Sequence, residues 1–249
     1  MRIIDSHVYV GESLFDQHQS VEDLISLMDT CGVSQVILAP NKPKTYSLCS
    51  ANRMVKEVVK QYPAKFLGWA RVDPWQKESA VDELKKAHDE YGFCGLILHP
   101  WEELFPVSGP IVDPLMKLAS QYQMPVMVEA GYSLVSHPLD IAELAKRFPE
   151  VTVIGTHGLQ LDSSAFALTD AEIAMHECPN LIMETSGMYA PFVMEKLVQD
   201  LGVERLIFGS HTPWMDMRLE VERINYLNLT SAQKEAIFAG NIKRILNIE

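Results

Sequence analysis

Several classes of protein are excluded by what the sequence lacks. No apolar run in its 249 residues approaches the roughly 20 residues that a membrane-spanning helix needs. No basic run exceeds two residues and the net charge is −12, so the basic footprint of a nucleic-acid binder or of an anionic-membrane protein is missing. The apolar stretch at the N-terminus is too short for a secretory signal.

Cysteine is sparse and scattered. The four cysteines form no C-x-x-C pair, a pattern typical of reduced thiols rather than of a disulfide frame or a zinc finger. We therefore expect a cytoplasmic protein. Hydrophobic residues make up 47% and charged residues 22%, the composition of an ordinary globular chain. The expected partner is a small-molecule substrate, and a homodimer remains an open alternative.

Apolar runs recur along the chain at nearly regular intervals. Each is four to seven residues long and often β-branched, which suits a strand buried on both faces of a parallel sheet. Successive runs begin 25 to 32 residues apart, with helix-like stretches between them. The runs begin near Ile3, Gln35, Phe66, Gly95, Val126, Val151, Leu181 and Leu206.

Helix boundaries are visible in several of the intervening stretches. Ser20 begins a capping-box pattern and Gly32 supplies a stop, while Pro138 stands at a first helical position. A last helix is expected from Thr230 to about Leu246. Eight strand–helix units of about 30 residues predict an α/β protein with a (β/α)₈ barrel, in one domain over residues 1–249. An open doubly wound sheet more often has fewer strands and a glycine-rich first turn, which is not found here.

Histidines gather where the predicted strands end. In a (β/α)₈ barrel the active site lies at the carboxyl ends of the strands. A single histidine there is more often a cap that hydrogen-bonds a loop, whereas the set together with a glutamate suits a Zn²⁺-like ion. The residues that close the first, fourth, fifth, sixth and eighth runs are His7, His99, Glu129, His157 and His211.

These motifs resemble the amidohydrolase-2 branch of the amidohydrolase superfamily, whose members are metal-dependent barrel hydrolases and non-oxidative decarboxylases. The resemblance extends over nearly the whole chain, with motifs in the family's order. The matching segments are Ile4–Tyr9 (I-D-x-H-x-H), Tyr62–Phe66 (Y-P-x-R-F), Gly95–Pro100 (G-x-K-x-H-P), Thr156–Gly158, Phe208–Pro213 (F-G-S-D-x-P) and Gly240–Leu246 (G-N-A-x-R-L-L).

The sequence departs from the family pattern at the metal ligands. Tyr9 replaces the second histidine of H-x-H, Glu129 replaces a histidine, and His211 replaces an aspartate. The lysine that some relatives carboxylate has no counterpart, so a binuclear centre is not expected. Only His7 and His157 keep the identity that the resemblance implies.

In one hypothesis, the replacements at the metal-ligand positions still leave a complete set of ligands for one ion. His7, Glu129 and His211 hold one divalent ion, zinc by expectation, which activates water or polarises a carbonyl. His157 is either a further ligand or the acid/base, and a His211 that is not bound to metal is a general base. The predicted activity is hydrolysis of a small ester, lactone or amide. The runner-up is non-oxidative decarboxylation of a cyclic or aromatic carboxylate.

Two further hypotheses remain open. The first is a metal-free lactonase in which Asp5, His157 and His211 transfer protons. The second is a barrel that has lost catalysis and binds a small molecule, which the three replaced ligands favour. Buried imidazoles without a function argue against it, because they cost desolvation free energy unless paired.

Aromatic and basic side chains near the strand ends are candidates for substrate binding. Arg71, which closes the third run, is a candidate anchor for a substrate carboxylate, although an ion pair with Asp73 is the alternative. The expected pocket-lining residues are Tyr9, His99, Trp101 and Trp214.

Overall fold

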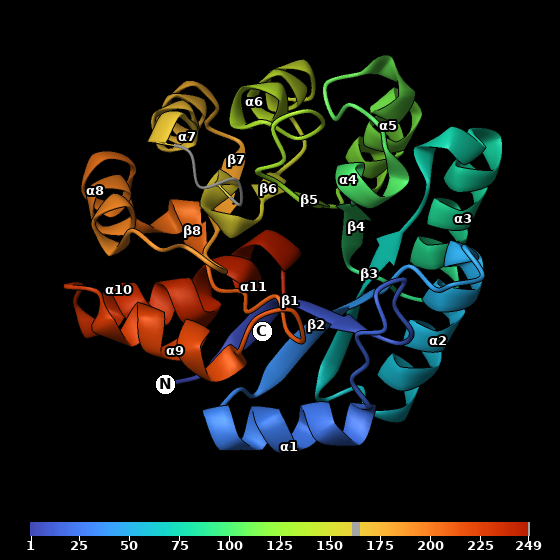
Figure 1. Ribbon diagram of the computed structural model, residues 1–249, viewed down its shortest axis with the longest axis horizontal. Helices are drawn as coiled ribbons and strands as arrows, with labels where there is room; N and C mark the ends of the chain where they lie inside the picture. The colour runs from blue at the N-terminus through green and yellow to red at the C-terminus, as the bar shows by residue number, and fades with distance from the viewer. Residues whose placement is uncertain (161–164, 249) are drawn as a thin grey trace. The chain divides into compact units, whose positions relative to one another are not determined.

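The computed structural model describes residues 1–160 and 165–248. Eight strands alternate with helices, and the strand order in the sheet follows the chain from β1 to β8 (Figure 1). This confirms the predicted α/β class and the (β/α)₈ barrel fold. The strands are β1 (Ile4–Val10), β2 (Gln35–Pro40), β3 (Phe66–Arg71), β4 (Gly95–Leu98), β5 (Val126–Val128), β6 (Val153–Gly155), β7 (Leu181–Glu184) and β8 (Leu206–Ile207).

The helix boundaries follow local chemistry. The Ser20 hydroxyl accepts a hydrogen bond from the Asp23 amide at the start of α1, and Gly32 ends this helix with a left-handed φ of 69°. The predicted last helix is divided by a π-helical turn, η5. The helices are α1 (Val21–Cys31), α2 (Leu48–Gln61), α3 (Glu78–Asp89), α4 (Pro100–Glu103), α5 (Asp113–Tyr122), α6 (Pro138–Arg147), α7 (Ala165–Glu177), α8 (Pro191–Leu201), α9 (Met217–Tyr226), α10 (Ser231–Glu235) and α11 (Asn241–Leu246). Short turns are η1 (Pro74–Gln76), η2 (Pro110–Val112), η3 (His157–Leu159), η4 (Val203–Arg205) and η5 (Ala236–Gly240).

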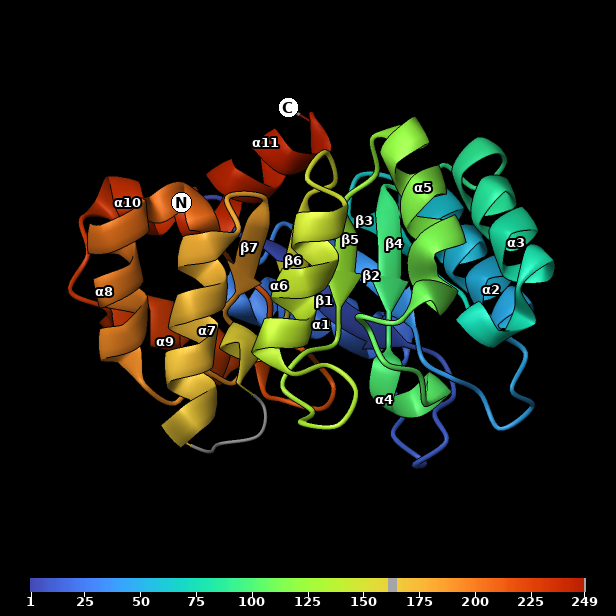
Figure 2. The same ribbon diagram turned by 90° about the horizontal axis from the view of Figure 1, so that it is seen from above.

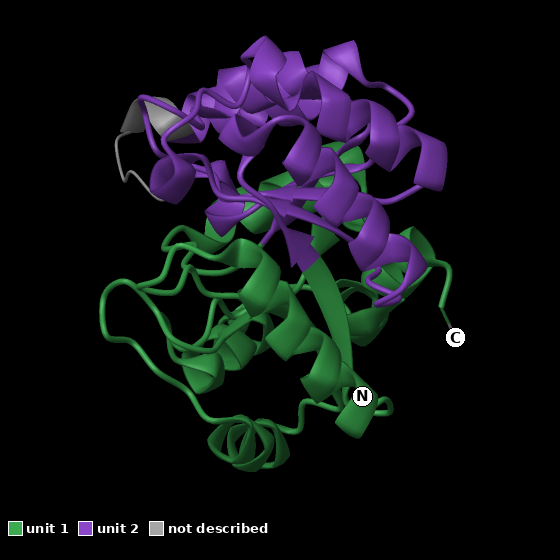
Figure 3. Ribbon diagram, turned by 90° about the vertical axis from the view of Figure 1, so that its right-hand side faces the viewer, with its two compact units in different colours: residues 1–69, 185–249 green, residues 70–184 purple. Residues whose placement is uncertain are grey.

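Two compact units can be distinguished in the chain (Figure 3). Unit 1 comprises residues Met1–Trp69 and Thr185–Glu249, and unit 2 comprises Ala70–Glu184. Both are built from the same strand–helix repeat. We keep the single domain over residues 1–249 as a proposal.

Unit 1 brings the two ends of the chain together. β1 pairs in parallel with β2, with an irregularity between Asp5 and Val8, and Val8 also forms a parallel bridge with Thr212. The Ser6 hydroxyl donates to the carbonyl of Phe208 at 2.7 Å, and the Trp69 indole donates to the Ser6 carbonyl at 2.8 Å. The first and last strand ends of the chain are therefore fixed against each other.

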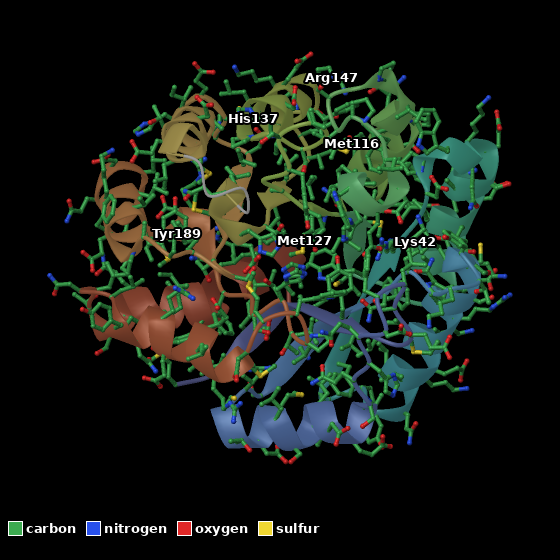
Figure 4. The ribbon with its side chains drawn as sticks, in the orientation of Figure 1. Lys42, Met116, Met127, His137, Arg147 and Tyr189 are labelled. Carbon is green, nitrogen blue, oxygen red and sulfur yellow. The ribbon has the colours of Figure 1, made fainter. Side chains whose placement is uncertain are left out.

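Unit 2 contains the parallel run β4–β5–β6–β7, whose strand residues are almost all fully buried. Figure 2 shows α4 directly beyond the end of β4. Met116 of α5 is fully buried, while ion pairs link the outer helices: Arg147 lies 3.0 Å from Asp113 and His137 lies 3.3 Å from Asp170 (Figure 4). In the described part of the chain, no helix is long and apolar enough to cross a membrane.

Candidate active site

Two imidazoles stack on each other within unit 1, one from the middle of β1, where a strand end was expected, and one from the segment after β8. The ring centroids of His7 and His211 lie 4.6 Å apart with an interplanar angle of 17°. Tyr9, which is 1% exposed, packs edge-on against both rings at 5.4 and 5.6 Å. The amide of His211 donates to the carbonyl of His7 at 2.7 Å, so a backbone hydrogen bond holds the two residues next to each other. Two adjacent imidazoles are a common part of a divalent-metal site.

Asp5, two residues before His7 in β1, is fully buried. Its Oδ1 accepts hydrogen bonds from the amides of His7 at 3.1 Å and Ser210 at 2.9 Å. Oδ2 is buried with no hydrogen-bond partner among the described residues. Burial raises the pKa of the Asp5 carboxyl to about 7, although the hydrogen bonds from Ser210 and His7 oppose this shift. Asp5 therefore joins the two segments that carry His7 and His211.

A second buried cluster follows β5 and β6 within unit 2. Oε2 of Glu129 lies 2.9 Å from Nε2 of His157 and accepts a hydrogen bond from the Thr156 hydroxyl at 3.1 Å. The side chains of Glu129 and His157 are each 1% exposed. The amide of His157 donates to Oε2 of Glu184, at the end of β7, at 3.3 Å. The cluster thus fixes one carboxylate and one imidazole in a place that is shielded from bulk water.

The backbone around His157 adopts an uncommon conformation. His157, Gly158 and Leu159 all have positive φ angles of 56°, 59° and 63°. His211 likewise has a φ of 55°. Non-glycine residues in this region cost free energy and are concentrated at functional sites. A Cβ added to Gly155 would lie 2.0 Å from Cδ2 of Leu159, so the absence of a side chain at the end of β6 leaves room for the buried Leu159 side chain.

Arg71 is buried in an ion-pair network rather than paired with Asp73. Its guanidinium lies 2.5 Å from Glu102 and 2.8 Å from Glu103, across about 30 residues of chain. His99 caps the same short helix, since its Nδ1 accepts a hydrogen bond from the Glu102 amide. Asp73 instead accepts a hydrogen bond from the Trp75 amide. The roles of Arg71 and His99 in substrate binding stay predictions.

Aromatic side chains lie beyond the ends of β4, β5 and β8: Trp101 in α4, and Tyr132 and Trp214 in loops. Trp101 and Tyr132 stack with a centroid distance of 5.4 Å, both within unit 2, and Trp101 is 41% exposed. Burial, together with the charges of Glu129 and Glu102, raises the pKa of the Tyr132 hydroxyl, so this group remains a donor. In unit 1, Trp214 stacks on His211 at 6.4 Å and meets Phe15 edge-on at 5.8 Å.

Comparison with known proteins assigns the family. The model of the amidohydrolase family matches residues 16–248. The chain belongs to the amidohydrolase family. The family was identified correctly from the motifs, although the matched segment begins after β1 and so does not include His7.

The relatives of known activity include decarboxylases. A γ-resorcylate decarboxylase from Polaromonas sp. is 19% identical over 281 residues, covering 90% of this chain and 86% of that protein. The structure of 5-carboxyvanillate decarboxylase from Sphingomonas paucimobilis matches with a TM-score of 0.79 and 14% identity, covering 100% and 99% of the two chains. A dihydroxybenzoic acid decarboxylase from Polaromonas sp. with bound manganese matches with a TM-score of 0.76 and 15% identity, covering 99% and 96%.

Within this family pattern, sequence reasoning found the charged and imidazole residues but missed their partners. In the sequence, Thr156 was visible only as the neighbour of His157, and Glu184 only as the last residue of a predicted strand. Ser210 lies inside the Phe208–Pro213 motif, but that motif did not indicate its contact with Asp5, and no motif includes Tyr132. Threonine and glutamate at strand ends next to a histidine are the signal that could have revealed the first two, because a buried imidazole needs hydrogen-bond partners.

Proposed function

We propose that the protein is a metal-dependent, non-oxidative decarboxylase of an aromatic carboxylate whose ring carries a hydroxyl group. The relatives named above are all decarboxylases, so their names favour this runner-up hypothesis over hydrolysis. The observation that carries the proposal is the buried hydrogen bond between Glu129 and His157, because it joins a candidate metal ligand to a candidate proton carrier.

His7, Glu129 and His211 are proposed to hold one divalent ion. The donors fit such an ion, because two imidazoles and a carboxylate are all buried and the two rings are already stacked. A manganese-bound relative makes manganese a candidate beside the expected zinc. When bound, the ion supplies positive charge that holds the oxygens of a substrate and stabilises negative charge on them.

His157 is assigned to proton transfer rather than to ligation, because its Nε2 is already hydrogen-bonded to Glu129. In the reaction the ring carbon takes up one proton, its bond to the carboxylate carbon breaks, and the electron pair of that bond restores the aromatic ring as CO₂ leaves. The Glu129 carboxylate stabilises the protonated imidazole, and the Glu184 contact to the His157 amide fixes the turn that carries it. Asp5 acts as a positioning residue for His7 and for the segment before His211.

The stacked pair Trp101–Tyr132 is proposed to pack against the substrate ring. Offset aromatic stacking favours flat ligands, and the Tyr132 hydroxyl remains available as a hydrogen-bond donor. Tyr9 fills the position of a family metal ligand without being one of the proposed ligands, so it is assigned to the wall of the site.

The test is a reaction assay on protein loaded with Mn²⁺ or Zn²⁺, with 2,6-dihydroxybenzoate and 5-carboxyvanillate as substrates and CO₂ release and arene formation as readouts. A panel of esters and lactones runs in parallel. We expect CO₂ release that chelation abolishes. Glu129→Gln should lower kcat at least about 100-fold, as loss of an electrostatic group in an active site does, whereas the exposed Glu150→Gln should match the wild type.

Two outcomes would overturn the proposal. Turnover of a lactone or ester without CO₂ release would restore the hydrolase hypothesis. Decarboxylation that survives chelation and the Glu129→Gln change would remove the metal from the mechanism. Metal content measured on the same samples separates loss of the ion from loss of proton transfer.

A further inference from the structure

We propose that unit 1 carries a second small-molecule site, between the β1–α1 and β2–α2 connections, which binds an organic ammonium ion with an apolar body. The cavity measures about 500 Å³, a size typical of small-ligand pockets. The connections that supply its lining are the dark-blue and light-blue segments that follow β1 and β2 in Figure 1. The cavity is defined by Val10, Gly11, Val21, Asn41, Ala51 and Met54, with polar groups around them.

The body of the cavity is apolar and depends on Gly11. Val10 is 1% exposed and Ala51 is 7% exposed, and both line the space together with the flexible thioether of Met54. Gly11 has a φ of +87°, and a Cβ there would lie 2.6 Å from Cε of Met54. The absence of a side chain at residue 11 therefore leaves room for Met54 in the wall of the cavity. These surfaces suit the hydrocarbon part of a ligand.

The polar lining offers hydrogen-bond acceptors. Asn41 is 4% exposed, and its Nδ2 donates to the carbonyl of Gly11 at 3.1 Å. Its Oδ1 is an acceptor by the chemistry of the amide group. Oε1 of Gln19, also in the lining, is buried and has no hydrogen-bond partner in the described part of the chain. A buried acceptor without a donor costs free energy that a donating ligand recovers.

The charged side chains of the lining determine whether a cationic or an anionic ligand is favoured. Glu12 and Glu22 line the cavity together with His18, while the lining residues include no lysine or arginine. The adjacent Lys42 is not part of the lining, and its ammonium lies 5.4 Å from the centroid of the Tyr46 ring (Figure 4). Carboxylates and amide oxygens together favour an ammonium head with several donors and disfavour the anionic substrates of the proposed reaction.

The experiment is isothermal titration calorimetry of the metal-loaded protein with 2-phenylethylammonium, compared with 2-phenylethanol and phenylacetate. We expect saturable binding of the ammonium and at least about tenfold weaker binding of phenylacetate, the ratio that a hydrogen bond to a charged group supplies. Glu129→Gln should leave the affinity unchanged, which separates this cavity from the site of the proposed reaction.

Substitutions in the lining test whether the ammonium ion binds in this cavity. Gln19→Met removes an acceptor at constant size and should weaken ammonium binding several-fold, whereas Gln19→Glu should strengthen it. Ala51→Phe fills the cavity and should abolish binding, while Val81→Phe, in a cavity of about 460 Å³ on unit 2, serves as the matched control. Absence of saturation at millimolar ligand, equal affinity for phenylacetate, or an affinity that neither Gln19 variant changes would overturn the proposal. The two Gln19 variants keep the test decisive if Ala51→Phe does not fold.

Discussion

Replacing Asp5 by asparagine should change how the stability of the metal-free protein depends on pH. The carboxyl of Asp5 is fully buried, and burial raises its pKa from 3.8 to about 7. An acid whose pKa is raised in the folded state stays protonated there over a pH range in which the unfolded chain ionises. Its contribution to the free energy of unfolding is therefore present below pH 4 and lost progressively up to about pH 7.

The size of the effect follows from the shift. Each pKa unit corresponds to about 1.4 kcal/mol, so between pH 5 and pH 8 the wild type should lose about 3 kcal/mol that the Asp5→Asn variant does not lose. The asparagine Oδ1 can still accept hydrogen bonds from the amides of His7 and Ser210. Any cost of placing an amide nitrogen at the Oδ2 position is independent of pH, so it shifts the difference by a constant.

The assay is urea unfolding of both proteins in the presence of chelator, at pH values from 5 to 8, followed by circular dichroism and tryptophan fluorescence. The stability of Asp5→Asn relative to the wild type should rise with pH and level off above about pH 7. The exposed Asp82→Asn variant should show a flat difference. A flat or falling difference for Asp5→Asn would refute the assignment of a raised pKa to this buried carboxyl.

Two other predictions concern unit 2. Arg71→Met should destabilise the protein by about 3–5 kcal/mol in urea unfolding, because it removes the buried guanidinium that neutralises Glu102 and Glu103. A loss below about 1 kcal/mol would contradict this reasoning. Lys65→Met, at an exposed ion pair, should cost at most about 1 kcal/mol and is the control. Trp101→Ala should raise KM for an aromatic carboxylate about tenfold with little change in kcat, consistent with the loss of a stacking surface, and a fall in kcat alone would argue that the ring positions the reacting groups instead.

Local chemistry explains why much of the fold could be predicted. A strand buried on both faces is a continuous apolar run, and a cap such as Ser20 or Gly32 acts within four residues of its own position. The boundaries of the strands were predicted less accurately. The sixth strand begins at Val153 rather than Val151, because the Val151 amide donates to the carbonyl of Phe148 in a turn. The π-helical turn in the last helix has no comparable signal in the sequence.

The candidate site was predictable to the level of individual residues but not of contacts. The position of Glu129 directly after a strand follows from the apolar pattern, whereas the hydrogen bond between Glu129 and His157 depends on the register of two neighbouring strands. His7 was expected at a strand end but lies in the middle of β1. The partner of Arg71 shows the same limit. Asp73 was the near candidate, yet the charges that face the guanidinium come from the segment after the next strand.

Gly155 affects how the results of mutational screens of this protein should be interpreted. Any side chain there would collide with the buried side chain of Leu159, which must then shift within the turn that also carries His157. In a screen of single substitutions scored by turnover, residue 155 would therefore group with the residues that perform the chemistry, although it offers no functional group of its own. A screen scored by abundance would report a packing defect at the same residue. Agreement between the two scores at Gly155, and divergence at Glu129, would separate the support of the site from its reactive groups.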